Sequence, residues 1–309
     1  MERDSLGRDV DISEAYTLGD VTVYPDKFAS ADPALLKDAD IVVVNKIPMN
    51  AETLAQADNL KLICLSATGM NNIDFDYVNS RGIQVKNVKD YSTNAVAMHT
   101  FAMLLYLYEH LSYYDDFVKS GAYAASAGFS HFERAYLELQ DKTWGIIGMG
   151  AIGSRVAEIA KAFGCRVIYY STSGANLDRP YEHVGLSELL KSSDVVSIHC
   201  PLNDKTGNLI AKDELAMMKK SAFLINVARG GIVNEDDLYD ALVNHVIEGA
   251  GLDVLTEEPP SSDMKILSFK DSSRLIVTPH MGWGPLEARQ RCFDGVCANI
   301  RDFLSSYKK

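Results

Sequence analysis

The sequence predicts an α/β protein built from two Rossmann-like or flavodoxin-like parallel-sheet domains. Three observations support this prediction. The chain has 309 residues, which is more than one average domain. Short β-rich runs alternate with segments of helical periodicity along most of it. A glycine pattern, G-x-G-x-x-G, stands between a strand and a helix near the middle. We place one domain at residues 1–92 and 284–309 and the other at 93–283.

The N-terminal third alternates expected strands with expected helices. Its strands are predicted at residues 20–24, 41–44, 61–65 and 83–88, and its helices at 32–37 and 51–57. Such alternation implies a parallel sheet, and ligands bind such sheets at the carboxyl ends of the strands. The loops 45–49 and 66–72 occupy those positions.

A long apolar helix is expected to begin near Asn94, with Ser92 or Thr93 able to cap it. Because residues 95–111 are apolar almost all round, we expect one face to be buried between domains or between subunits. The stretch 112–140 shows no strong period, so no structure is predicted for it.

The glycine pattern lies in a strand–turn–helix–strand context. A strand ends at Ile147, a helix is expected over 154–163 with Gly164 as its C-cap glycine, and 166–170 reads as the next strand. Gly148 permits the tight turn, Gly150 lets a pyrophosphate approach the backbone, and Gly153 lets the helix pack closely on the strand. A tight turn that binds nothing is the alternative. The surrounding βαβ unit favours dinucleotide binding.

The rest of the chain continues the βα alternation. Helices are expected at 187–191, 212–218, 235–244 and 285–304, and strands at 194–199, 222–227, 250–254 and 275–277. The closing helix follows the last strand of the second domain, so we expect it to return to the first.

Composition narrows the class of protein. The net charge of −12 disfavours nucleic acid or an anionic membrane as a partner. Neither a signal sequence nor an apolar run of membrane-spanning length is evident, which predicts a cytoplasmic protein. The five cysteines form no C-x-x-C pair, and the seven histidines show no paired metal spacing. We therefore expect reduced, mostly buried thiols and no metal.

Three residues near strand ends carry candidate chemistry. Arg229 follows an apolar strand, and its planar guanidinium could bind a carboxylate through two hydrogen bonds. Glu258 and His280 stand after the next two strands. Taken singly, these residues are also compatible with a structural ion pair, a solvated loop charge and an uninvolved histidine. Together at one sheet edge, a histidine, a carboxylate and an arginine are what the reduction of a 2-keto acid requires.

These motifs resemble the D-isomer-specific 2-hydroxyacid dehydrogenase family. The resemblance rests on the glycine turn, residues 226–233 (NVARGGIV), GLDV at 251–254 with Glu258-Pro259, TPH at 278–280, and TGMNNID at 68–74. It covers almost the whole chain and looks most like the glycerate dehydrogenases or hydroxypyruvate reductases. It implies a homodimer that pairs through the nucleotide domain, with the active site in the cleft between the two domains. Residues 93–283 would then bind NAD or NADP, and 1–92 with 284–309 would bind substrate.

The resemblance also implies individual roles. Arg229 would hold the substrate carboxylate, helped by backbone N–H groups of Thr68, Gly69 and Met70. His280 would donate a proton to the carbonyl oxygen, and Glu258 would keep the imidazole protonated near neutral pH. Asp253 would contact the nicotinamide carboxamide. The other implied cofactor contacts, from the glycine turn to the last strand end, are Gly148, Gly150, Ala151, Ile152, Gly153, Ser171, Cys200, Val227, Ala228 and Gly282.

The sequence departs from the family pattern at three places. The usual first hydrophobic strand is missing from the N-terminus, so either the chain starts late or its first sheet lacks a strand. Met98 stands where an acidic residue is frequent. Ser171 replaces the usual aspartate for the ribose hydroxyls, which leaves the choice between NAD and NADP open. A dinucleotide-sensing scaffold of the same fold, related to corepressors, is the alternative function.

Overall fold

The computed structural model describes residues 1–24 and 32–307. The chain forms two compact units. Unit 1 comprises Met1–Ser92 and Trp283–Lys309, and unit 2 comprises Thr93–Gly282. The predicted boundary is one residue late: Trp283 belongs to unit 1, because it packs against a cluster in that unit formed by Leu6, Val10, Phe293 and Cys297.

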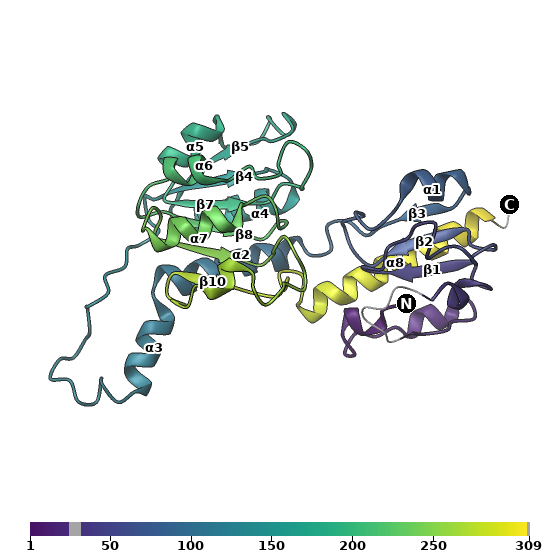
Figure 1. Cartoon of the computed structure of the whole chain (residues 1–309), viewed down its shortest axis with the longest axis horizontal. Coiled ribbons are helices and arrows are strands. Elements are labelled where there is room, and N and C mark those ends of the chain that lie inside the picture. Colours follow the sequence, from purple (N-terminus) through teal and green to yellow (C-terminus); the bar gives the residue numbers. More distant parts are fainter. Residues whose placement is uncertain (25–31, 308–309) are drawn as a thin grey trace. The chain divides into compact units, whose positions relative to one another are not determined.

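Unit 1 contains a three-stranded parallel sheet in the order β1-β2-β3. Its elements are β1 (Ile41–Val44), β2 (Leu62–Leu65), α1 (Phe75–Ser80), β3 (Gln84–Lys86), α8 (Leu286–Tyr307) and three short 3₁₀ helices, η1 (Arg3–Leu6), η2 (Ser13–Thr17) and η3 (Pro33–Leu36). The closing helix α8 packs on this sheet (Figure 1), where its Cys292 and Val296 share a buried cluster with Leu62 and Cys64 of β2.

Three N-terminal predictions are wrong. Residues 20–24 form no strand, and their side chains Val21 and Val23 are exposed, so no sheet neighbour pairs with them. The helix expected at 32–37 is only the 3₁₀ turn η3. Residues 51–57 form turns, because the Asn50 side chain accepts hydrogen bonds from the amides of Glu52 and Thr53 and so competes with helix formation.

Unit 2 contains a seven-stranded parallel sheet in the order β10-β9-β8-β7-β4-β5-β6. Its strands are β4 (Thr143–Ile147), β5 (Arg166–Tyr170), β6 (Glu182–His183), β7 (Val195–Ile198), β8 (Phe223–Asn226), β9 (Gly249–Leu252) and β10 (Leu275–Val277). The strand order reverses beside β4, which pairs with both β5 and β7. The glycine turn follows β4 and therefore lies at the switch point where such sheets bind ligands.

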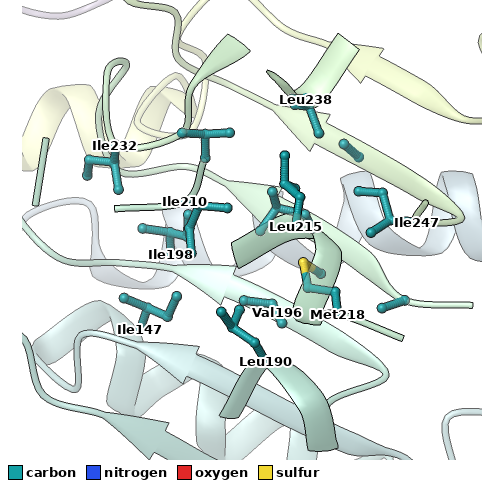
Figure 2. Packing of buried hydrophobic residues seen from close by; sticks show 14 of the residues in the cluster. Ile147, Leu190, Val196, Ile198, Ile210, Leu215, Met218, Ile232, Leu238 and Ile247 are labelled. Carbon is teal, nitrogen blue, oxygen red and sulfur yellow. The ribbon is translucent and has the colours of Figure 1, made fainter. Parts of the chain in front are cut away.

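Helices cover both faces of this sheet (Figure 1). They are α2 (Thr93–Tyr108), α3 (Leu111–Lys119), α4 (Ala151–Ala162), α5 (Leu186–Ser192), α6 (Lys212–Met217), α7 (Glu235–Val243) and the 3₁₀ helix η4 (Lys265–Ser268). One buried cluster joins the sheet to α5, α6 and α7. Figure 2 shows Leu190, Leu215 and Leu238 of these helices in this cluster, together with Val196 and Ile198 of β7. A second cluster joins the other face to α2 and α4.

The apolar character of α2 is accounted for within unit 2. Nine of its residues are buried, and seven of these share a cluster with strands β4, β5, β7 and β8. The close fit continues at β9, where a Cβ added to Gly251 would lie 3.2 Å from Cε of Met103. Among the helices of residues 1–24 and 32–307, none is both long and apolar enough to cross a membrane.

Candidate active site

The turn after β4 has the features of a pyrophosphate site. Gly148 adopts a left-handed conformation with φ of 96°, and a Cβ there would lie 2.7 Å from the Cys200 nitrogen. Gly150 is the N-cap of α4, and no side chain caps this helix. A Cβ added to Gly150 would meet no atom within 4 Å. The first amides of α4 therefore border open space, which suits the phosphates of a dinucleotide.

The loop after β5 carries hydroxyl groups where a carboxylate was expected. The Ser171 hydroxyl donates to the Ala175 carbonyl at 2.6 Å, and the Ser173 hydroxyl accepts from the Ala175 amide at 3.2 Å. Asp178, the acid that follows in this loop, is exposed. Ser171 itself therefore offers a ribose no negative charge.

Cys200 follows β7 beside the glycine turn. The side chain is buried, and burial raises the pKa of its thiol to about 11 despite a hydrogen bond with Thr172. A thiol in this state is neutral at physiological pH and is a poor nucleophile. All five cysteines are buried and unpaired, as predicted.

The loop after β8 presents Arg229. Asn226 shapes this loop, since its side chain donates to the Arg229 carbonyl and accepts from the Ala228 amide. The guanidinium Nη1 of Arg229 donates to the Ala228 carbonyl at 2.7 Å. A Cβ added to Gly230 would lie 1.9 Å from the Leu255 carbonyl oxygen. This close approach brings the Arg229 loop against the segment that follows β9.

His280 and Glu258 form a direct contact. Nδ1 of His280 lies 2.8 Å from Oε2 of Glu258, and Oε1 of Glu258 accepts from the Leu255 amide at 3.1 Å. The two side chains are 24% and 35% exposed. Because Nδ1 is engaged by the carboxylate, Nε2 is the ring nitrogen available for proton transfer.

Asp253 organises the turn that carries His280. Its carboxylate accepts hydrogen bonds from the Thr278 hydroxyl at 2.7 Å and from the amides of Met281 and Gly282 at 2.7 and 2.8 Å. Asp253 is 2% exposed. Burial acts to raise its pKa, but the hydrogen bonds outweigh burial and hold the pKa below its usual value.

Six strand ends thus bring most of the predicted residues to one edge of the sheet in unit 2. Because all seven strands are parallel, the loops after β4, β5, β7, β8, β9 and β10 share that edge. The list comprises Gly148, Gly150, Ala151, Ile152 and Gly153, then Ser171, Cys200, Val227, Ala228, Arg229, Asp253, Glu258, His280 and Gly282.

Thr68, Gly69 and Met70 belong to unit 1, in the loop after β2. Two hydrogen bonds, both accepted by backbone carbonyl oxygens, hold this loop in place. The Thr68 hydroxyl donates to the Val88 carbonyl at 2.9 Å, and the Asn87 side chain donates to the Thr68 carbonyl at 2.6 Å.

The sequence analysis missed His99 and Thr278, which both contact Asp253. A titratable side chain within the apolar segment 95–108 was the available signal for His99. Among the described residues, no group of three histidine, cysteine, aspartate or glutamate side chains could hold a metal ion.

Comparisons with known proteins identify relatives over nearly the whole chain. The family model described as "D-isomer specific 2-hydroxyacid dehydrogenase, NAD binding domain" matches residues 101–282. Glycerate dehydrogenase of Methylorubrum extorquens is 38% identical over 271 residues, which are 87% of this chain and 84% of that protein. Hydroxypyruvate reductase of Blautia hydrogenotrophica is 34% identical over 302 residues, 96% of this chain and 92% of that protein.

A solved structure of an acyclic imino acid reductase, in complex with NADPH and D-Arg, has a similar fold. It superposes with a TM-score of 0.85 at 32% identity and covers 96% of this chain and 92% of that one.

Proposed function

Because the chain belongs to the D-isomer-specific 2-hydroxyacid dehydrogenase family, we propose that it interconverts hydroxypyruvate or glyoxylate with the corresponding 2-hydroxy acid. The observation that carries this proposal is the His280–Glu258 contact at 2.8 Å, on the sheet edge that bears the uncapped helix α4 and Arg229. The relatives named glycerate dehydrogenase and hydroxypyruvate reductase support a short 2-keto acid as substrate.

Each residue has a defined task in keto-acid reduction. Arg229 binds the substrate carboxylate, and backbone N–H groups of Thr68, Gly69 and Met70 assist it. When bound, a nicotinamide dinucleotide supplies the hydride for the carbonyl carbon. His280 gives a proton from Nε2 to the carbonyl oxygen, so that the alkoxide charge is neutralised as it develops. Glu258 holds the imidazole in place through Nδ1.

The cofactor contacts follow from the same edge. The amides of Ala151 and Ile152 at the start of α4 bind the pyrophosphate, and Cys200, Val227 and Ala228 line the nicotinamide side. Asp253 contacts the nicotinamide carboxamide and Gly282 lies beside the cofactor, while the hydrogen bond between these two residues also holds the turn around His280.

We propose that both NADH and NADPH serve as reductants. Ser171 leaves out the carboxylate that would repel a 2′-phosphate, and hydroxyl groups accept either cofactor. The similar imino acid reductase was solved with NADPH, which supports this reading.

We further propose a cytoplasmic homodimer. Five unpaired, buried cysteines suit a reducing compartment. Large apolar side chains are exposed along residues 111–137 of unit 2, including Phe129 at 93% and Phe132 at 83%. Ordered apolar surface of this kind marks protein interfaces.

The decisive experiment follows oxidation of NADH or NADPH by absorbance. The candidate substrates are hydroxypyruvate, glyoxylate, pyruvate and longer 2-keto acids, and the product enantiomer is identified by chiral chromatography. We expect turnover with hydroxypyruvate or glyoxylate. His280→Gln should reduce kcat by roughly 10²–10⁴-fold with nearly unchanged cofactor affinity. Absence of oxidation with every keto acid would instead favour a dinucleotide-sensing scaffold.

A further inference from the structure

His99 contacts the turn that carries the proton donor, from a different element. The side chain projects from α2, and its Nε2 lies 3.0 Å from the Thr278 hydroxyl oxygen and 3.2 Å from Oδ1 of Asp253. Its side chain is 19% exposed, whereas that of Asp253 is 2% exposed. The contact therefore links α2 to the ends of both β9 and β10.

The hydrogen-bond directions at this contact are fixed by the donors present. Thr278 has one hydroxyl hydrogen, and it is used in the 2.7 Å bond to Asp253. The Thr278 oxygen can then only accept from His99. Oδ1 of Asp253, a carboxylate oxygen, also only accepts. Nε2 of His99 must therefore carry a hydrogen, shared between these two oxygens.

The turn held by this contact is conformationally demanding. His280 has φ of 54°, in the left-handed region that non-glycine residues rarely adopt. The His280 amide donates to carbonyls of Asp253 and Thr278 at 2.8 and 2.9 Å. A Cβ added to Gly282 would lie 3.0 Å from Oδ2 of Asp253 and 3.5 Å from Cγ2 of Val96 on α2. The Asp253 carboxylate and α2 together enclose the turn.

We propose that His99 is a positioning residue for proton transfer: by donating to Asp253 and Thr278, it holds the turn that orients His280. The proposal rests on the function assigned above to His280. It gives a buried polar contact on α2 a role in the reaction rather than in folding alone.

Few charged side chains lie on the elements that pack around Asp253. Helix α2 carries no lysine, arginine, aspartate or glutamate, and β8, β9 and β10 are also without them. The remaining titratable groups on the loops after β8, β9 and β10 are Arg229, bonded to the Ala228 carbonyl, the His280–Glu258 pair, and the exposed Glu257 and Asp263. Substitution of His99 therefore removes one hydrogen-bond donor directly from the Asp253 carboxylate.

The pH dependence has a definite sign. Hydrogen bonds, including that from His99, lower the pKa of Asp253. The ionised carboxylate is the form that accepts all of its donors, so activity is lost as the pH falls through that pKa. Removing His99 raises the pKa and moves this acid limb to higher pH.

The test compares the purified full-length enzyme with His99→Leu, His99→Gln and His183→Leu. Leucine removes the donor, glutamine keeps one, and His183 is an exposed histidine on β6 at the far edge of the sheet. We expect His99→Leu to lower kcat about tenfold and to move the acid limb of the kcat profile to higher pH. The KM for NADH should change less than about twofold. His99→Gln should recover most of both effects, and His183→Leu should match the unmodified enzyme.

Two results would overturn the proposal: an unchanged pH profile in His99→Leu, or a kcat loss that His99→Gln does not recover. If the unmodified chain reduces no keto acid, the proposed function fails, and NMR titration of labelled histidines decides the inference separately. His99→Leu should then shift the His280 ring resonances while His183→Leu leaves them in place. Unshifted His280 resonances in His99→Leu would refute it.

Discussion

At the scale of single residues, the His280–Glu258 contact orients the proposed proton donor. Nδ1 of His280 lies 2.8 Å from the Glu258 carboxylate, which leaves Nε2 for the substrate. Glu258→Gln keeps the size and one acceptor but replaces a charge-assisted hydrogen bond with a weaker neutral one. We therefore expect kcat for hydroxypyruvate reduction to fall roughly 10–100-fold, with the KM for NADH nearly unchanged. Steady-state rates with hydroxypyruvate measure this, and an unchanged kcat would show that Glu258 is not the partner of His280 in the reaction.

Cofactor choice is also decided by one residue. Ser171→Asp places a carboxylate at the end of β5, where it would repel a 2′-phosphate and accept bonds from ribose hydroxyls. The ratio of kcat/KM for NADH to that for NADPH should rise at least about tenfold, equivalent to about 1.4 kcal/mol. Ser171→Ala is the control, since it removes the Ala175 contact without adding charge, and its ratio should stay within about threefold. An unmodified enzyme that already rejects NADPH would show that another acid reaches the ribose.

At the scale of elements, two glycines of the G-x-G-x-x-G pattern, one at the N-cap of α4 and one inside it, separate the requirements of folding from those of cofactor binding. A Cβ on Gly153 would lie 2.2 Å from the Gly148 carbonyl oxygen, whereas a Cβ on Gly150 would meet nothing within 4 Å. Gly153→Ala should therefore destabilise unit 2 by about 1–3 kcal/mol. Gly150→Ala should leave Tm nearly unchanged and weaken NADH binding at least about tenfold, because the methyl group occupies the space that the pyrophosphate needs. Thermal unfolding and NADH fluorescence titration measure the two effects. Equal loss of Tm in both variants would count against this division.

Most elements of the second half were predictable because they have their own local signal. From β4 to β10, apolar runs long enough to fill a buried strand alternate with helices of clear period. The exceptions are β6, whose two residues are exposed, and the short 3₁₀ helix η4, and neither was predicted. The N-terminal segments lack such signals. The run 20–24 resembles a strand, yet Val21 and Val23 stay exposed. The pattern of 51–57 resembles a helix, yet Asn50 and Thr53 bond to the local backbone instead. The composition of a short segment cannot show whether a neighbouring strand is available to pair with it.

For the candidate site, the positions of the three main residues could be predicted from the sequence, but the hydrogen bonds that support them could not. Arg229, Glu258 and His280 follow strands of one parallel sheet, so their common edge follows from the βα order alone. Their supporting bonds do not. The Asp253 carboxylate meets Thr278, Met281 and Gly282 through backbone geometry that only the folded turn provides, and His99 reaches it from a helix about 150 residues earlier in the chain.

At the scale of the whole molecule, the segment that follows α2 is the part of unit 2 with least support from the sheet. Figure 1 shows α3 and the residues after it extending away from the seven-stranded sheet. The segment is nevertheless held together. The His131 ring stacks on Phe117 with centroids 3.7 Å apart, and Nε2 of His131 lies 2.7 Å from the Tyr113 hydroxyl. The Arg134 guanidinium donates a hydrogen bond to the Ser273 hydroxyl and so links the segment to the rest of unit 2.

This arrangement turns aromatic side chains outward. Phe129 and Phe132 are 93% and 83% exposed, and side chains of this size are rarely left in water without a partner. A second copy of the chain is the partner proposed here, and a two-fold symmetric dimer would cover the same surface on both copies.

The double variant Phe129→Asp/Phe132→Asp tests the proposed dimer. Two carboxylates on each copy would have to be buried in the interface, so the variant should elute as a monomer under conditions where the unmodified chain has the mass of two. Size-exclusion chromatography with light scattering measures this. Tyr16→Asp is the control, because it also places an acid at an exposed aromatic position, but in unit 1, and should leave the dimer intact. A dimer that survives the double substitution would place the interface elsewhere, and a monomeric unmodified chain would refute the pairing itself.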